Sequence, residues 1–137
     1  MNQEIASLFL RLSLAGGFLS AVASRLGLWG KKSSGWNSFL DYTAQVNSFA
    51  PKSIIPTLAV ASTLLEITLA ILLLIGFKTK YAASGTGVLT LLFAIAMSYS
   101  FGIKEPLDYS VFAVSAAAFL LATLPASKWS IDLILNH

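Results

Sequence analysis

Two ionisable side chains interrupt long apolar stretches of this sequence. Glu66 lies near the middle of the apolar stretch 54–77, and Arg11 lies within the first apolar stretch. One unpaired charge at that depth in a bilayer costs about 2.5–3.5 kcal/mol on insertion scales. A bidentate contact between arginine and a carboxylate removes most of that cost, because it satisfies most of the hydrogen-bonding groups of both. Such a pair either holds two helices together, or lines a polar cavity that binds a head group or relays a proton.

The depths of the two residues predict that they meet. Counted from the same membrane face, Arg11 lies about two turns inside its helix and Glu66 about three turns inside the next. With a rise of about 1.5 Å per residue, the two backbones differ in depth by a few ångströms. An arginine side chain is long enough to span that difference. We therefore expect an ion pair between Arg11 and Glu66 on antiparallel neighbours.

Other polar and aromatic residues lie towards the opposite membrane face. Arg25 comes late in the first apolar helix and joins Arg11 and Glu66 as a candidate for a functional polar core. Six residues are candidates for a pocket mouth: Trp36, Tyr42, Asn47, Tyr99, Asp108 and Tyr109. Asp108 also suits the start of a helix, where the helix dipole favours a carboxylate. For Trp36, Tyr42 and Asn47, the alternative is that the segment 36–49 serves only as an anchor or as a lid that closes one end of the bundle.

The composition excludes several classes of protein. Of 137 residues, 56% are hydrophobic and 11% are charged, whereas a soluble domain has about 25% charged residues. There is no cysteine, and the single histidine is His137, so thiol chemistry and a metal site are not expected. The net charge of +3 is small and its basic residues are scattered, which makes a nucleic-acid partner improbable. We expect no catalytic residue and lean towards a protein without enzymatic activity.

The apolar stretches predict an all-α integral membrane four-helix bundle formed by a single domain, 1–137. The expected spans are about 5–29, 54–77, 82–102 and 107–124. Apolar residues recur at helical spacing in about 36–49, which predicts a short interfacial amphipathic helix between the first two spans. An even number of spans places both termini on the same side, and the counts of Lys and Arg favour the cytoplasm for the long first loop. The expected location is the inner (cytoplasmic) membrane.

Small residues form two rows in the first span. Gly16, Ser20 and Ser24 recur every fourth residue, and Ser13, Gly17 and Ala21 form a neighbouring row. Small residues at this spacing allow helices to approach closely in lipid.

Three stretches of the chain resemble the DoxX family of small bacterial membrane proteins, over about 8–124. They are "LRLSLAGGFLSAVASRLGLWG" with Arg11 and Arg25, "LLEITLAILLLIGFKTK" with Glu66 and Gly76, and "PLDYSVF" at the start of the last span. The resemblance implies a four-helix bundle and kinship with the quinone-linked membrane subunit of thiosulfate oxidation. Arg11, Glu66 and Arg25 are carried over as family-pattern positions. Some relatives of this fold resemble assembly factors or chaperones of membrane proteins.

Two functional hypotheses follow. In the first, the chain is a non-catalytic subunit that binds a quinone, a lipid or another lipophilic ligand near the buried Arg–Glu pair. A membrane redox partner would then carry the redox centre, because this chain has no cysteine. In the second, it is a structural or assembly protein that binds partner helices. The expected partners are the lipid bilayer and either a redox partner or further copies of the chain.

Overall fold

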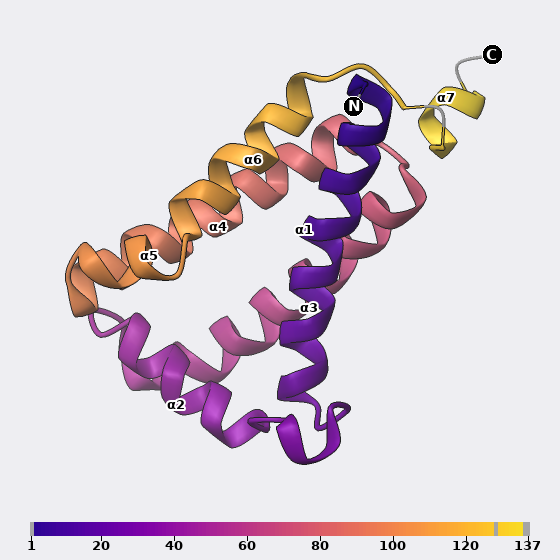
Figure 1. Cartoon of the computed structure of the whole chain (residues 1–137). Coiled ribbons are helices and arrows are strands. Elements are labelled where there is room, and N and C mark those ends of the chain that lie inside the picture. The colour runs from indigo at the N-terminus through magenta and orange to yellow at the C-terminus, as the bar shows by residue number, and fades with distance from the viewer. Residues whose placement is uncertain (1, 128, 136–137) are drawn as a thin grey trace.

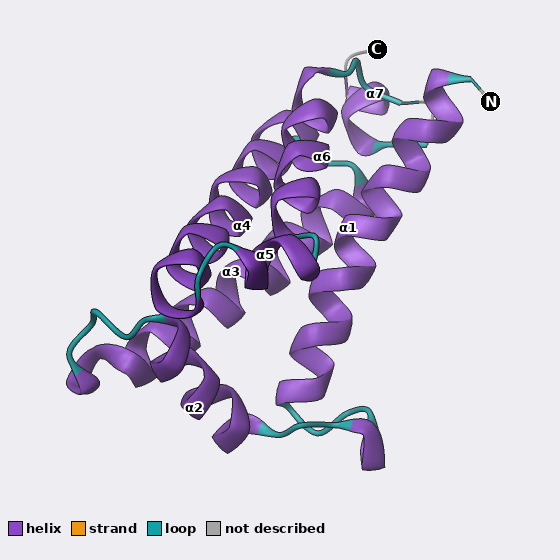
Figure 2. Ribbon diagram, turned by 60° about the vertical axis from the view of Figure 1, so that its left-hand side comes forward, coloured by secondary structure: helices purple, strands orange, loops and turns teal. Residues whose placement is uncertain are grey.

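The computed structural model describes residues 2–127 and 129–135, and the elements in this part of the chain are helical (Figures 1 and 2). Three long helices, α1 (Gln3–Arg25), α3 (Ile55–Ile75) and α4 (Thr79–Phe101), pack with the shorter α6 (Val111–Thr123). The start of α1 and the short helix α7 (Ile131–Leu135) lie at the same end of the molecule (Figure 1). From that end, α1 and α6 diverge, so that they lie apart at the opposite end of the molecule (Figure 1).

Three of the four expected spans are confirmed as helices that are long and apolar enough to cross a membrane. They run over Gln3–Arg25, Lys52–Ile75 and Thr79–Phe101, where the second includes the 3-10 turn η2 (Lys52–Ile54). The short turn between α3 and α4 makes these two helices an antiparallel hairpin. The apolar stretches of the sequence thus identify a multi-pass membrane protein.

The fourth expected span, 107–124, is not continuous. A short helix α5 (Lys104–Asp108) is followed by a turn in which Ser110 adopts the left-handed conformation, with φ +58°, and only then does α6 begin. The 13 residues of α6 reach about 20 Å, whereas the hydrocarbon core is about 30 Å thick. The expectation that Asp108 begins a spanning helix is wrong, because Asp108 ends α5 instead.

The amphipathic helix expected at 36–49 is present as α2 (Trp36–Val46). It follows η1 (Gly30–Lys32) and begins after Gly35, which has φ +87°. α2 contacts both α3 and α4 and lies across the end of the molecule where α1 and α6 are apart (Figures 1 and 2). Val46, Ala96 and Met97 form a small buried cluster there. This helix therefore closes one side of the space between the diverging helices.

The main core lies towards the end with the termini and is built from small and medium-sized side chains. Its buried members come from α1, α3, α4 and α6: Leu14, Ala15, Phe18, Ala70, Leu73, Ala82, Ala83, Ala118 and Leu121. The alanines allow close approach of helix backbones, as in other membrane helix pairs. Ser115 of α6 donates a hydrogen bond of 2.8 Å to the carbonyl of Gly87 on α4 and joins the two helices.

The small-residue rows of α1 face away from the other described helices. Ser13, Gly16, Gly17 and Ser20 are exposed, and a Cβ atom added at Gly16 or Gly17 would meet nothing within 4 Å. Ala21 and Ser24 are half-buried, and the Ser24 hydroxyl hydrogen-bonds to Ser34. The exposed part of the rows therefore presents a smooth outer surface.

Gly87 is the tightest glycine contact between α4 and α6, and Gly87→Ala is expected to lower stability by about 1–3 kcal/mol. The added Cβ would lie 2.8 Å from atoms of the Phe119 ring, so the two helices must move apart or the ring must leave its place. Thermal unfolding in detergent measures the effect. Gly16→Ala is the control and is expected to be neutral or stabilising, since it removes only glycine flexibility. Equal stability of the two variants would contradict the packing described for α4 and α6.

Candidate functional site

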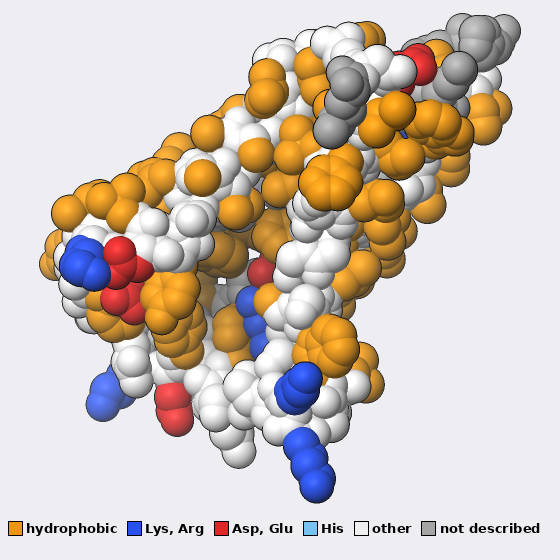
Figure 3. All heavy atoms as spheres, viewed as in Figure 1, with side chains coloured by type: hydrophobic (Ala, Val, Ile, Leu, Met, Phe, Trp, Pro, Cys, Tyr) orange, Lys and Arg blue, Asp and Glu red, His pale blue; other side chains and the backbone are white. Residues whose placement is uncertain are grey.

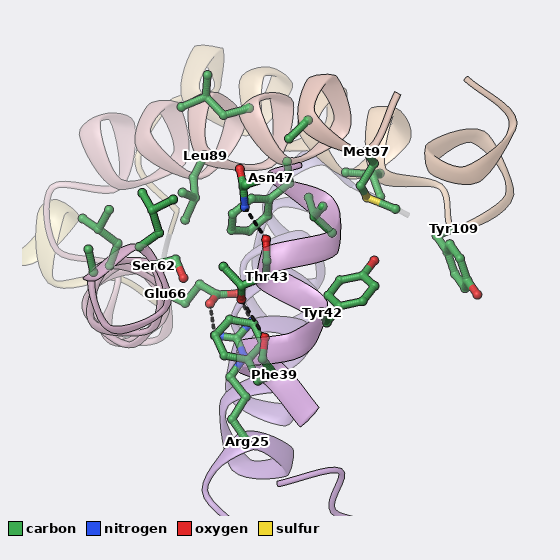
Figure 4. A pocket seen from close by; sticks show the side chains of 18 residues that line it. Arg25, Phe39, Tyr42, Thr43, Asn47, Ser62, Glu66, Leu89, Met97 and Tyr109 are labelled. Atoms are coloured by element: carbon green, nitrogen blue, oxygen red, sulfur yellow. Dashed lines mark hydrogen bonds and ion pairs between the residues drawn. The ribbon is translucent and has the colours of Figure 1, made fainter. Parts of the chain in front are cut away.

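Glu66 forms an ion pair with Arg25, from the last turn of α1, and not with Arg11. Nη1 of Arg25 donates to Oε2 of Glu66, and Nη2 donates to Oε1 at 3.2 Å (Figure 4). The side chains are only 10% and 3% exposed, respectively. The pair therefore replaces two buried charges by one neutral, bidentate unit.

Two further side chains hold the guanidinium of Arg25 in place. Nη1 also donates a 3.0 Å hydrogen bond to the hydroxyl of Thr63, which in turn donates to the carbonyl of Ala59 at 2.8 Å. The Phe39 ring lies against the guanidinium, with 3.7 Å between Cζ of Arg25 and the ring centroid. A cation over an aromatic face gains electrostatic attraction when both are removed from water. Residues from α1, α2 and α3 thus meet at one charged group.

Arg11 is buried and satisfied by other groups, so the expected Arg11–Glu66 pair is wrong. Its Nε and Nη2 donate to the carbonyls of Leu73 and Leu74 at 2.8 and 2.9 Å. Its Nη1 donates to Ser127 Oγ at 2.9 Å and to the Trp129 carbonyl at 3.0 Å. The last carbonyls of a helix lack partners within that helix and carry partial negative charge, which suits a cation. Arg11 therefore caps the end of α3.

The direction of helical side chains explains the exchange of partners. A helical side chain leans towards the N-terminus of its own helix. Glu66 therefore leans towards the start of α3, which lies near the end of α1, whereas Arg11 leans the other way, towards the end of α3. Arg25 leans back from the end of α1 into the interior and meets Glu66.

The Arg25–Glu66 pair forms one wall of a cavity of about 470 Å³ between α2, α3 and α4. Figure 3 shows a hollow between the diverging helices, with basic and acidic side chains visible inside it. The other lining residues are mostly apolar: Phe39, Val46, Leu58, Ala61, Leu65, Leu89, Leu92, Phe93, Ala96, Met97 and Val111, with Thr43 and Ser62 among the polar ones. The cavity is thus apolar, with one charged but neutralised wall.

Three of the six residues expected at a pocket mouth line this cavity: Tyr42, Asn47 and Tyr109. Figure 4 shows Tyr42 on α2 and Tyr109 at a greater distance from the ion pair. The Asn47 side chain is used within α2, where Nδ2 donates to the carbonyl of Thr43 at 3.0 Å. Partial burial raises the pKa of Tyr42, and Glu105 and Tyr109 raise it further, so its phenol keeps its proton and can donate a hydrogen bond.

The other three do not line the cavity. The ring of Trp36 packs near that of Phe39, with 5.5 Å between centroids. Tyr99 packs edge-on against Phe49, and Asp108 pairs with Lys104 one turn earlier in α5. The expectation that Trp36, Tyr99 and Asp108 form the mouth is therefore wrong. Arg11 lies outside the cavity as well.

Phe39 and Thr63 are the contributors that sequence reasoning missed. Both are ordinary residues of an apolar helix face, and only their contact with Arg25 distinguishes them. Among the described residues, no group of three or more His, Cys, Asp or Glu side chains could hold a metal ion. What the arrangement offers chemically is an apolar volume with hydrogen-bond donors: the Tyr42 hydroxyl and Nε of Arg25, which donates to no described residue.

The family of the chain follows from comparison with known proteins. The family model for DoxX matches residues 6–99, which is more than half of the chain and includes most of α1, all of α2 and α3, and most of α4. No match was found among curated proteins or among solved structures. The matched region contains Arg25 and Glu66 and most of the three apolar helices that are long enough to span a bilayer. The chain belongs to the DoxX family and is a multi-pass membrane protein.

Proposed function

We propose that this chain is a non-catalytic membrane subunit that binds a lipophilic ligand in the cavity beside Arg25 and Glu66, with a quinone as the first candidate. The observation that carries the proposal is an apolar cavity of about 470 Å³ whose inner wall is a buried ion pair. Ligand pockets for small molecules measure about 300–1,000 Å³ and combine apolar walls with a few placed polar groups.

The chemistry of a quinone head group fits these walls. A quinone presents a flat apolar ring and two carbonyl oxygens that accept hydrogen bonds. The Tyr42 hydroxyl and Nε of Arg25 are donors for such oxygens, and Leu92, Phe93 and Met97 offer apolar contact to the ring and its tail. A bound quinone would supply redox chemistry. Because the chain has no cysteine and its single histidine is His137, a partner would have to carry the other redox centre.

The proposed setting is a four-helix bundle in the inner (cytoplasmic) membrane with both termini on one side. The three long helices and the shorter α6 support the bundle, and the shared end of α1 and α7 supports the common side of the termini (Figure 1). The ion pair would then lie within the membrane, where an isolated charge is costly and where polar groups commonly serve ligands.

Filling the cavity tests the proposal directly. Ala61 lines the cavity, so Ala61→Phe is expected to reduce the retained ligand to background. Val60 is the matched control: it is 47% exposed, lies outside the cavity, and Val60→Phe is expected to retain the ligand. The measurement is mass spectrometry of a solvent extract from protein purified in mild detergent. Each variant must first show an unfolding temperature close to that of the wild type.

Two outcomes would contradict the proposal. One is a wild-type protein that retains no quinone or lipid above the amount found with Glu66→Gln. The other is equal retention by the Ala61→Phe and Val60→Phe variants, which would place the ligand elsewhere.

One observation favours a second candidate function, the assembly of membrane proteins. Gly16 and Gly17 lie on an exposed small-residue surface of α1, and a Cβ atom added at either would meet nothing within 4 Å. Such surfaces let a second helix approach closely in lipid. Under this function, Gly16→Leu would abolish co-purification of a specific membrane partner or of a second copy, and Ala61→Phe would leave it unchanged.

A further inference from the structure

A second cavity, of about 320 Å³, lies at the end of the molecule that holds the termini. Its walls come from the start of α1, the turn between α3 and α4, the end of α6 and the segment that follows. The charged residues that line it are Arg11, Lys78, Lys80 and Asp132, and four hydroxyl side chains line it as well: Ser7, Thr79, Tyr81 and Ser127. The first cavity is mostly apolar, whereas this one is basic.

The charges of this cavity do not cancel. Asp132 is the one carboxylate among its lining residues, and its two oxygens accept hydrogen bonds from the backbone N–H groups of Lys78 and Thr79, at 2.5 and 2.7 Å. Neither lysine side chain forms an ion pair with a described residue. With three cations against one occupied carboxylate, the site carries a formal charge of +2.

The backbone at Lys78 adds a second observation. Lys78 has φ +49° and ψ +44°, a left-handed conformation that glycine and asparagine adopt readily and lysine does not. Residues held in such conformations cost about 1–3 kcal/mol and cluster at functional sites. A lysine at this position suggests that its charge is used there, since asparagine would fit the turn better.

Thr79 supplies a third observation. Its hydroxyl oxygen is buried and has no hydrogen-bond partner among the described residues. A buried polar atom without a partner is costly, and it is commonly satisfied by a bound ion or water. Thr79 is one of the residues that line the same basic cavity as the two lysines.

We propose that this second cavity binds the phosphate group of an anionic phospholipid. Lys78 and Lys80 would provide the attraction, and the Thr79 hydroxyl would donate a hydrogen bond. A lipid is favoured over free phosphate, because Leu124 and Tyr81, which is 75% exposed, lie beside the basic groups. Basic pockets between membrane helices bind anionic head groups in this way, and tyrosine prefers the membrane interface.

The test compares phosphatidylglycerol with phosphatidylcholine. Delipidated full-length protein in detergent is titrated with each lipid, and bound lipid is counted by native mass spectrometry. We expect the wild type to prefer phosphatidylglycerol about tenfold or more, and the variant Lys78→Asn, Lys80→Gln to lose that preference. Asparagine tolerates the left-handed conformation, so the variant should fold as well as the wild type. The control Lys31→Gln, Lys32→Gln removes the same charge from η1, at the opposite end, and should keep the preference.

The outcomes are distinct. A preference that survives in the Lys78→Asn, Lys80→Gln variant, or a wild type without any preference, overturns the proposal. A third titration with inorganic phosphate separates the two sources. If phosphate stabilises the wild type but not this variant, and phosphatidylglycerol binds no better than phosphatidylcholine, the lipid assignment is overturned in favour of a free anion. None of these results bears on the ligand of the first cavity.

Discussion

Replacing Glu66 by Gln is expected to lower the free energy of unfolding by about 3–5 kcal/mol. The substitution keeps the shape of the side chain but leaves the Arg25 cation, only 10% exposed, without its carboxylate. The glutamine amide oxygen can still accept a hydrogen bond, but it supplies no negative charge to balance the guanidinium. Chemical unfolding in detergent measures the loss. The exposed pair on α5 gives the control, since Asp108→Asn removes an exposed contact that is worth about 0–1 kcal/mol.

A double variant separates the structural role of this pair from its role in binding. Arg25→Met, Glu66→Met removes both charges together, and apolar replacements of a buried ion pair are commonly neutral or stabilising. We therefore expect the double variant to be more stable than Glu66→Gln and yet to lose the retained ligand. If it keeps both its stability and its ligand, the pair has no part in binding.

Replacing Gly76 by Ala is expected to cost about 2–5 kcal/mol, from about 1–2 for the left-handed backbone and about 1–3 for overpacking. Gly76 ends α3 with φ +70°, and a Cβ there would lie 2.7 Å from Nη2 of Arg11 and 2.8 Å from Cα of Ser130. The backbone at this point is also used, because its carbonyl accepts a 2.9 Å hydrogen bond from the N–H of Asp132. The substitution is therefore expected to displace Arg11 and Ser130 together.

Thermal unfolding in detergent checks this expectation, with Gly16→Ala as the control. Gly16 lies within α1, and a Cβ atom added there would meet nothing within 4 Å, so its replacement by alanine should be neutral or stabilising. Equal unfolding temperatures for the two variants would show that the Gly76 contact with Ser130 and Arg11 does not exist in the folded protein.

Much of the fold could be predicted because membrane spans are a property of local sequence. The length of each apolar run predicts a helix that crosses the hydrocarbon, and three of the runs are such helices. The break between α5 and α6 was not predictable in this way. It occurs at Tyr109 and Ser110, neither of which is a glycine or a proline, and Ser110 nevertheless adopts the left-handed conformation.

The candidate site was predicted only in part, because the prediction did not consider the direction in which helical side chains lean. Sequence reasoning found that Glu66 needs a cation, and depth along the helices alone favoured Arg11. The direction in which helical side chains lean gives the correct partner, Arg25, and could have been applied to the sequence. The real acceptors of Arg11 were not accessible to such reasoning, because three of them are backbone carbonyls.

Density in the cavity beside the ion pair is the most direct test of the proposed ligand. The measurement is an experimental structure of the protein purified in nanodiscs with its native lipids. For the wild type, the proposal predicts an elongated density that contacts Tyr42 and Arg25. In the Ala61→Phe variant, the same region should be empty or filled by the new phenylalanine ring. A structure in which the helices close over Glu66 and leave no room beside it would contradict the binding role.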